Sequence, residues 1–400
     1  MTLSRRDFLK ISSMASSMLF VPKFLKAFES NPMLDTKGKV LIVLQLTGGN
    51  DGLNTIIPYR NDIYYRSRPL IAIKKEDAIN LTDDIGLNPS LKNIKTLFDQ
   101  GYVSIINNVG YPDPNRSHFR SMDIWQSGSN AEQMINSGWL GRYFDTLQDE
   151  ATNNRNSFAI EVDDTLSLAM KGKNKTAIAV KNIEQFHKAA GNPFYKKLAA
   201  HNMEHESKLA GYLYQTLRET TSSADYIYQQ SKIYNSTQVY PDTALGKRMK
   251  TIGSLIISGA DTKVFYLSHG SFDTHVDQIN RQQKLFEQMD EALFALVSDL
   301  KQNNRFKDVL IMTFSEFGRR VAQNASNGTD HGTASNMFII SESLKKQGLY
   351  NPIADLDNLD QGDLKYQIDF KEVYSTILNK WLNANGEVVL NKKYQSLDFI

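Results

Sequence analysis

Hydrophobic and polar positions along the chain form two repeating patterns. Short continuous apolar runs at residues 40–46 and 309–314 are typical of strands buried on both faces. Between residues 278 and 302, apolar side chains recur at spacings of three and four, which predicts a long amphipathic helix. Further strands are expected at 102–107, 158–162, 176–180, 263–267 and 337–340, and further helices at 91–100, 119–127, 194–230, 243–258 and 370–382.

The order of these elements predicts the fold class. Strands that alternate with helices indicate an α/β fold, in which a doubly wound, mostly parallel sheet is covered by helices on both faces. The length of 400 residues is enough for one large domain, which we place at residues 38–390. The polar helical stretch at residues 194–240 is interpreted as a helical cap inserted into this domain.

The N-terminal 30 residues have the pattern of an export signal. Arg5 and Arg6 match the twin-arginine consensus, and a weakly apolar stretch follows at residues 11–20. That stretch is too short and too polar for a stable membrane span, and the alternative is an ordinary amphipathic helix. We therefore expect the twin-arginine export machinery as a partner and a periplasmic or extracellular location.

Composition narrows the chemistry. The chain has no cysteine, which excludes disulfides, thiolate metal ligands and a cysteine nucleophile. The net charge is +2, but residues 1–28 hold five basic groups and one acid, so the remainder is near −2. This balance gives no indication of nucleic-acid binding.

Acids and histidines follow the predicted strands. Ligands in parallel α/β sheets bind beyond the carboxyl ends of the strands, where such side chains meet. Carboxylates and imidazoles at one sheet edge are suited to a divalent ion, which we expect to be Zn, Mg, Mn or Ca. The alternative is that these residues only form turns and caps. The predicted ligands are Asp51, Asp273, His275, Glu316, Asp330 and His331.

A second polar run, at residues 115–121, can supply catalytic groups. His118 is a candidate ligand or acid–base group, and Ser117 a nucleophile if a metal lowers the pKa of its hydroxyl. Arg116 and Arg120 can hold an anionic oxygen of a phosphate or sulfate group. The alternative is that Ser117 caps a helix and the arginines are solvated.

Two other basic side chains raise the same question as Arg116 and Arg120. Arg319 and Arg320 lie in the segment that follows the strand at 309–314 and can also bind an anion. One of the two is expected to pair with Glu316.

One further motif suggests a different enzyme class. His201, Glu204 and His205 have the H-x-x-E-H spacing of a zinc-peptidase motif. They lie in a polar helical stretch with no apolar face to bury a metal, so a peptidase is the least favoured alternative.

The ordered set of motifs resembles the DUF1501 family over roughly residues 38–383. The segments that carry the resemblance are LTGGNDGLNTIIPY, NRSHFRSMDIWQSG, FDTH, TFSEFGRR, GTDHGTAS and QIDFKEVYSTILNKWL. The family is grouped with the alkaline phosphatase-like and sulfatase-like superfamily. The resemblance therefore implies a doubly wound α/β core with divalent metals at the strand ends.

The resemblance also implies roles for single residues. Asp51 would match the ligand after the first strand, Asp273 and His275 an acid–histidine ligand pair, and His331 the late histidine ligand. Ser315-Glu316 stands where the superfamily has an Asp-His pair, which departs from two-metal phosphatase chemistry. No cysteine is present for a formylglycine nucleophile, so Ser117 would be its substitute.

Together these observations predict an exported, metal-dependent hydrolase of phosphate or sulfate esters. Its substrate is expected to be a small anionic ester or a polysaccharide. The alternative is a non-catalytic binding or assembly protein on the same scaffold.

Overall fold

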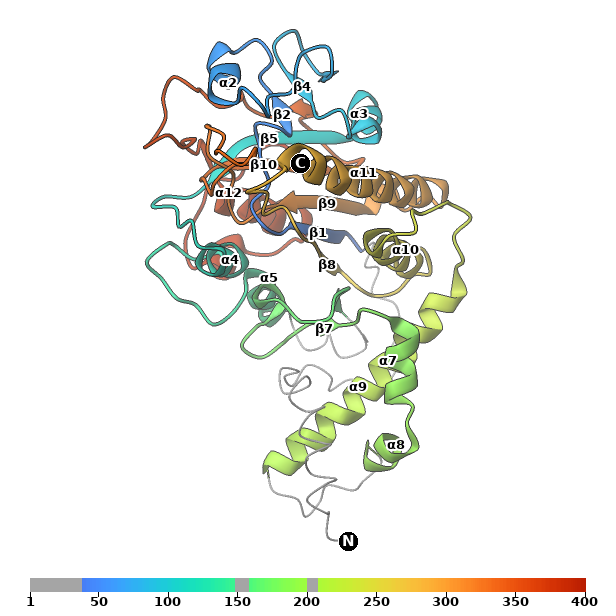
Figure 1. The fold of residues 1–400 in the computed structure, drawn as a ribbon. Coiled ribbons are helices and arrows are strands. Elements are labelled where there is room, and N and C mark those ends of the chain that lie inside the picture. Colours follow the sequence, from blue (N-terminus) through green and yellow to red (C-terminus); the bar gives the residue numbers. More distant parts are fainter. Residues whose placement is uncertain (1–37, 148–157, 200–207) are drawn as a thin grey trace.

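The structure is a computed structural model that describes residues 38–147, 158–199 and 208–400 (Figure 1). The predicted signal segment at 1–30 and the H-x-x-E-H motif at 201–205 lie outside these residues. The main sheet has nine strands in the order β11-β5-β10-β9-β1-β8-β6-β7, with β12 paired to β5. Its strands are β1 (Val40–Leu46), β5 (Val103–Gly110), β6 (Ala159–Glu161), β7 (Ile178–Ala179), β8 (Val264–His269), β9 (Val309–Phe314), β10 (Ser335–Ile340), β11 (Gly348–Leu349) and β12 (Ile368–Asp369).

The sheet is mostly parallel, which confirms the predicted α/β class. The central strand β1 pairs in parallel with both β8 and β9, so that Leu41 lies opposite Val264 on one side and Leu310 on the other. Among the described strands of this sheet, only β10 runs antiparallel, to β5 and β9. Parallel neighbours need a long crossover, usually a helix. Residues 315–334, between β9 and β10, contain no helix, and the chain turns back beside the strand it has left.

Helices cover both faces of the sheet because side chains alternate along each strand. Leu41 and Val43 of β1 belong to the core formed with α4, α5 and α12, whereas Ile42 and Leu44 face α3, α10 and α11. Figure 1 shows these two groups of helices on opposite sides of the strands. The helices of the two layers are α3 (Lys92–Asp99), α4 (His118–Ser127), α5 (Trp139–Thr146), α10 (Ala244–Ile257), α11 (Gln278–Gln302), α12 (Phe370–Thr376) and α13 (Gly386–Leu390), with short turns at η1 (Leu168–Met170), η2 (Phe306–Asp308) and the π-helical η3 (Ile377–Trp381).

A small second sheet follows β1 directly. It has the order β2-β4-β3 and includes β2 (Ile56–Ile57), β3 (Ile79–Asn80) and β4 (Gly86–Leu87), with helix α2 (Asp62–Ser67) between β2 and β3. Its side chains share a third core with Val321 and Leu364, from loops after β9 and β11. This unit therefore packs against the loops that follow the strands of the main sheet.

Three helices form an arm beside β7 and α10. They are α7 (Ile183–Ala190), α8 (Pro193–Ala199) and α9 (Lys208–Ile233). An ion pair of 2.7 Å joins Lys232 of α9 to Glu184 of α7. Figure 1 shows the arm projecting away from α2 and the small sheet. Within the predicted insertion at 194–240, the described residues form helices α8 and α9, and the role of this segment as a cap stays a prediction. Among the described residues, no helix is long and apolar enough to cross a membrane.

One acid inside the sheet makes stability depend on pH. Burial raises the pKa of Glu161 from 4.5 to about 8, although Ser167 donates hydrogen bonds to its carboxylate. Between these two pH values the folded protein keeps a proton that the unfolded chain has lost. Glu161 is therefore expected to lower the free energy of unfolding by up to about 1.4 kcal/mol per pH unit as pH rises through this window.

The measurement is urea unfolding at intervals from pH 5 to 8. Glu161→Gln removes the titration and keeps an oxygen for Ser167, so its stability should vary less steeply with pH. Glu342→Gln, at an exposed position, is the control and should keep the slope of the parent protein. An unchanged slope in Glu161→Gln would show that another group is responsible.

Candidate metal centre

Four side chains, from two loops and the start of helix α4, meet beyond the carboxyl ends of the strands. His118 is the first residue of α4. Asp273 and His275 lie between β8 and α11, and His331 lies between β9 and β10. Because β8 and β9 flank β1 in parallel, the loops that follow them reach the same edge of the sheet.

The donor atoms of these residues point at one another. Nε2 of His275 lies 3.0 Å from Oδ1 of Asp273 and 3.0 Å from Nε2 of His331. Nε2 of His331 is 3.2 Å from Oδ1 of Asp273, and Nε2 of His118 is 3.5 Å from Oδ2. Ligands of one tetrahedral zinc ion, each about 2.0–2.1 Å from it, lie roughly 3.3 Å apart. Ligand atoms of His118, Asp273 and His331 all lie within 4.8 Å of one another, which is close enough for a single ion, and His275 adjoins this trio through Asp273 and His331.

Each histidine is held by its other ring nitrogen. Nδ1 of His118 lies 2.9 Å from Oε1 of Glu316, and Nδ1 of His275 lies 3.2 Å from Oδ1 of Asp330. Nδ1 of His331 is 2.8 Å from the backbone oxygen of Arg116. In metal sites such acceptors fix the tautomer and orient the ring, so that Nε2 is left to bind the ion. Nε2 of His118 is buried and has no hydrogen-bond partner among the described residues.

Glu316 is itself fixed by the turn that follows β1. Its side chain is fully buried, and its Oε1 accepts a hydrogen bond of 2.8 Å from the backbone N–H of Gly48. Gly48 has φ +120, and a Cβ atom there would lie 2.4 Å from the backbone nitrogen of Asp273. Only glycine allows this close approach of the two loops.

A buried arginine ties the loops of the centre together. Nη2 of Arg319 lies 2.6 Å from Oδ1 of Asp273, and the same guanidinium donates to the backbone oxygens of Gly49 and Thr329. Arg320 instead approaches Asp363, with Nε 3.3 Å from Oδ1. The prediction that one of these arginines pairs with Glu316 is wrong, because the partners of Glu316 are a backbone N–H, a hydroxyl and an imidazole.

The surroundings shift the pKa values of the ionisable groups in different directions. Burial acts to raise the pKa of Asp273, but the Arg319 guanidinium outweighs it and lowers the value to about 2. The hydrogen bond to Glu316 raises the pKa of His118, whereas burial lowers that of His331. Asp273 therefore remains ionised throughout the neutral range, as a metal ligand must.

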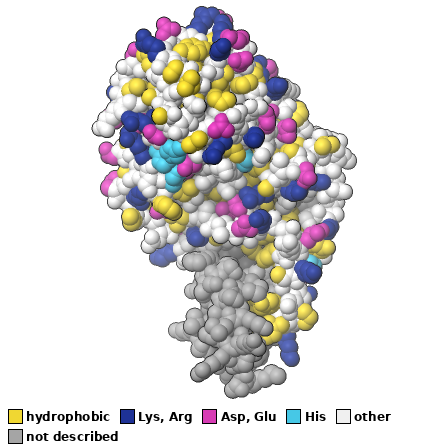
Figure 2. Space-filling model, in the orientation of Figure 1, with side chains coloured by type: hydrophobic (Ala, Val, Ile, Leu, Met, Phe, Trp, Pro, Cys, Tyr) yellow, Lys and Arg dark blue, Asp and Glu magenta, His cyan; other side chains and the backbone are white. Residues whose placement is uncertain are grey.

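The centre is open to solvent on one side. The side chains of Asp273 and His275 are 46% and 40% exposed. Figure 2 shows histidines gathered at the surface, with acidic and basic side chains around them. A small molecule from solvent can therefore reach these groups.

The sequence profile of the family described as "Protein of unknown function (DUF1501)" matches residues 100–381, more than half of the chain. The chain belongs to the DUF1501 family. No curated protein matches the sequence. His118, Asp273, His275 and His331 all fall within the part that matches the DUF1501 profile.

Several solved structures share a similar arrangement of the chain, and one of them is named a sulfatase. PsFucS1 sulfatase from Pseudoalteromonas sp. is 12% identical, with 90% of this chain and 71% of that chain covered and a TM-score of 0.40. Ps i-CgsB in complex with k-i-k-neocarrahexaose is 12% identical (89% and 73% covered, TM-score 0.38). A protein in the alkaline phosphatase superfamily from Vibrio parahaemolyticus is also 12% identical (86% and 70% covered, TM-score 0.33). At these scores, the fold class of this DUF1501 member rests on its own strand order and register.

Asp51, the ligand predicted after the first strand, lies outside the histidine group. Its buried carboxylate binds Arg68 through two contacts of 2.6 and 3.1 Å. It also accepts hydrogen bonds from Gln278 and from the backbone N–H groups of Leu53 and Asn54. A guanidinium and three N–H donors satisfy both oxygens, so we leave Asp51 out of the candidate centre.

Of the predicted catalytic residues, Ser117 and Arg116 lie near the histidine group, whereas Arg120 is engaged elsewhere. Ser117 is exposed at the start of α4, and its hydroxyl makes no capping hydrogen bond. Arg116 binds Asp363 beside the centre. Arg120 instead donates to the backbone oxygens of Ala131 and Gln133, at 2.8 and 2.5 Å.

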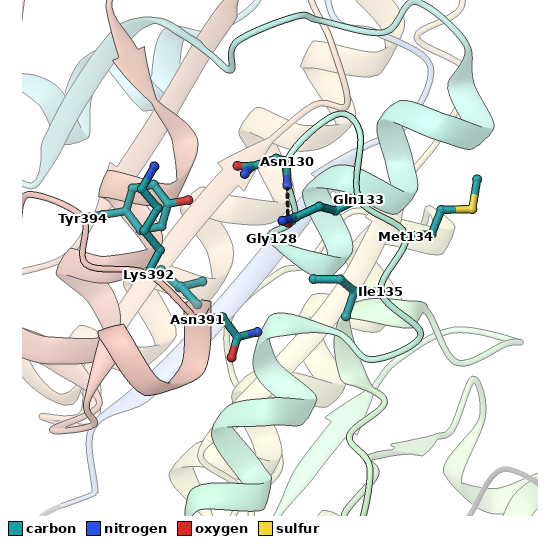
Figure 3. A pocket seen from close by; sticks show the side chains of 9 residues that line it. Gly128, Asn130, Gln133, Met134, Ile135, Asn391, Lys392 and Tyr394 are labelled. Carbon is teal, nitrogen blue, oxygen red and sulfur yellow. Dashed lines mark hydrogen bonds between the residues drawn. The ribbon is translucent and has the colours of Figure 1, made fainter.

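Arg120 thus supports a separate hollow at the far end of α4. Figure 3 shows this hollow, which Asn130, Gln133 and Ile135 line on one side and Lys392 and Tyr394 on the other. Arg120 is therefore assigned to the loop that forms this hollow and not to the histidine group.

Replacing Glu316 by glutamine tests the support of His118. The amide is nearly isosteric and keeps an oxygen for Gly48, but it removes the negative charge that faces Nδ1. We expect zinc affinity to fall by about 10- to 100-fold, as for other partners of metal-bound histidines. Competition with a fluorescent zinc chelator measures this change. Wild-type affinity in this variant would contradict the role of Glu316, and Glu342→Gln is the surface control.

Proposed function

We propose that this protein is an exported, metal-dependent hydrolase of phosphate or sulfate esters. The observation that carries the proposal is the convergence of three imidazole Nε2 atoms on the Asp273 carboxylate, each ring held through Nδ1. The proposed export rests on Arg5 and Arg6 in the N-terminal segment. The resemblance to the alkaline phosphatase-like superfamily supports the ester class.

The residues present fit a divalent ion, and zinc best among the ions considered. His118, His275, His331 and Asp273 would be its ligands, with Glu316 and Asp330 as the outer partners. Imidazoles suit zinc, whereas magnesium and calcium prefer a shell made of oxygen atoms. Nε2 of His118 is buried and makes no hydrogen bond among the described residues, with the Asp273 carboxylate 3.5 Å away. This supports the assignment, because a buried polar atom without a hydrogen bond is costly unless a ligand meets it.

The bound ion would polarise the ester and lower the pKa of the hydroxyl or water that attacks it. Hydrolysis consumes one water and converts the ester to an alcohol and a free oxyanion. Arg116 and Arg320 flank the centre and can hold the oxyanion. Phe119 next to His118 is 87% exposed and offers an apolar surface for the alcohol part of the ester.

The rival is a non-catalytic binding or assembly protein on the same scaffold. It would use the exposed centre or the arm α7–α9 to contact a partner. This rival predicts that a substitution of Asp273 or His331 leaves the biological role intact, whereas the hydrolase requires both. The peptidase alternative depends on residues 201–205, outside the described part of the chain.

The test begins with the metal content of the purified full-length protein, measured by mass spectrometry. Hydrolysis of 4-nitrophenyl sulfate, 4-nitrophenyl phosphate and bis(4-nitrophenyl) phosphate is then assayed before and after chelation and after zinc is restored. We expect about one ion per chain, turnover of at least one ester, loss with chelator and recovery with zinc. A protein with no bound ion and no response to chelator would overturn the proposal.

A matched pair of variants separates the catalytic from the structural role of the centre. His331→Ala removes a proposed ligand and should abolish turnover. His187→Ala removes a histidine of the arm and should not change it, because His187 pairs with Asp225 on α9. Equal activity of the two variants would favour the non-catalytic rival.

A further inference from the structure

Two arginines beside the histidine group share one buried carboxylate. Arg116 Nη2 binds Oδ2 of Asp363, and Arg320 Nε lies 3.3 Å from Oδ1 of the same group. The carboxylate is 1% exposed, whereas the arginine side chains are 41% and 37% exposed. Asp363 therefore holds two guanidiniums side by side at the surface and restricts their motion.

The backbone of the same arginines is joined to the metal centre. The carbonyl oxygen of Arg116 accepts from Nδ1 of His331 at 2.8 Å, and the N–H of Arg320 donates to the carbonyl of Asp330 at 3.0 Å. Each arginine thus supports the centre with its backbone and extends its side chain to Asp363. In the described part of the chain, the Arg116 guanidinium bonds Asp363 through Nη2 and its side chain is 41% exposed, whereas Nη2 of Arg320 also donates to the backbone oxygen of Gln361.

The charges of this region favour a singly charged ligand. Four carboxylates face three guanidiniums, which leaves one net negative charge, and a divalent ion turns this into one net positive charge. The carboxylates are Asp273, Glu316, Asp330 and Asp363, and the guanidiniums are Arg116, Arg319 and Arg320. A monoanion would neutralise this charge, whereas a dianion would leave an excess of negative charge at a partly desolvated site.

We propose that Arg116 and Arg320 form one oxyanion subsite, and that it selects substrates whose ester group carries a single negative charge. Sulfate monoesters and phosphodiesters have this chemistry, and phosphate monoesters, which are dianionic above neutral pH, do not. The inference rests on the proposed function for the ester class. The arginine pair itself rests on the contacts to Asp363.

The experiment measures binding as well as turnover. Calorimetry on the zinc-loaded protein at pH 8 compares methyl sulfate and dimethyl phosphate, which are monoanions, with the dianion methyl phosphate. At least one of the two monoanions should bind more tightly than methyl phosphate. Comparing the affinities of methyl sulfate and dimethyl phosphate then shows whether a sulfate ester or a phosphodiester is preferred. Tighter binding of methyl phosphate than of both monoanions would overturn the proposal.

Variants assign this binding to the arginine pair. Arg116→Gln and Arg320→Gln are each expected to weaken monoanion binding by roughly 10- to 100-fold, the loss of a charge-assisted hydrogen bond, with zinc content unchanged. Arg66→Gln, at an exposed position on α2, is the control and should bind like the parent. Parent-like affinity in both arginine variants would overturn the subsite.

The charge count has its own test. Asp363→Asn removes one negative charge, so affinity for methyl phosphate should rise relative to methyl sulfate. No change in this ratio would contradict the charge count. If no ester is hydrolysed but the arginine variants still weaken monoanion binding, the hydrolase proposal fails and the subsite stands. If esters are hydrolysed but the arginine variants bind and turn over like the parent, the hydrolase proposal stands and the subsite fails.

Discussion

Replacing Asp273 by asparagine is expected to remove most of the stabilisation that zinc gives to the folded protein. Asp273 lies within 3.5 Å of all three histidines, and it is the only carboxylate among the proposed ligands. An ion present at about 100 times its dissociation constant stabilises a folded protein by about 2.7 kcal/mol. Substitution of a residue that orients a ligand usually lowers metal affinity by roughly 10- to 100-fold. Loss of a direct ligand should therefore lower zinc affinity by about 10²-fold or more.

Thermal unfolding with and without added zinc, together with equilibrium dialysis, measures this effect. Asp277→Asn is the matched control, because Asp277 lies four residues on with φ 49, a conformation that asparagine adopts readily. The control should show the full zinc-dependent shift. Parent-like zinc affinity in Asp273→Asn would mean that the ion, if present, binds elsewhere.

Replacing Arg68 by methionine is expected to lower the free energy of unfolding by about 3–5 kcal/mol. The side chains of Arg68 and Asp51 are 0% and 1% exposed, so the substitution leaves a buried carboxylate without its counter-charge. The same guanidinium donates to the backbone oxygens of Val321 and Arg320, which also lose a partner. Urea unfolding at neutral pH measures the change.

Two further variants show how much of this loss comes from the unpaired buried charge of Asp51. Arg60→Met removes an exposed partner of Asp84 and should cost less than about 1 kcal/mol. Arg68→Met combined with Asp51→Asn should recover part of the loss, because the unpaired charge is gone. If the double variant also keeps parent-like zinc affinity, Asp51 is a structural acid. A collapse of zinc affinity in the double variant alone would restore Asp51 as a ligand.

Apolar periodicity predicted the frame of the fold well. The strands at 40–46 and 309–314 and the helix at 278–302 have the predicted bounds, because long apolar patterns in a buried layer leave little freedom. Polar stretches were harder to read. The helix predicted at 194–230 is represented by α8 and α9 in the described residues, and the closing helix at 370–382 changes to a π-helix at Ile377.

The candidate site was harder to predict than the fold. Strand ends indicated Asp273 and His275, and the glycine-flanked loop indicated His331, all of which meet in the structure. Nothing in the local sequence distinguishes a ligand from the residue that orients it. Glu316 and Asp330 were predicted as ligands, and that role stays a prediction. Their contacts with the imidazoles of His118 and His275 depend on distances between loops that only folding sets.

Arg68 shows most clearly that contacts between distant residues cannot be predicted from the local sequence. It lies 17 positions after Asp51, in a segment with no recognisable motif, yet it takes up the carboxylate that the resemblance assigns to a metal. Asp363 is a similar case, since its two arginine partners come from residues 116 and 320. Pairings of this kind carry no periodic signal along the chain.

The four proposed ligands span residues 118 to 331, and strands β1, β8 and β9 must be paired before their loops adjoin. An unfolded chain would hold these groups tens of ångströms apart and offer no high-affinity site. Loading of an ion therefore has to follow completion of the sheet. Zinc uptake during refolding would report the last step of assembly, and not the formation of any single helix or strand.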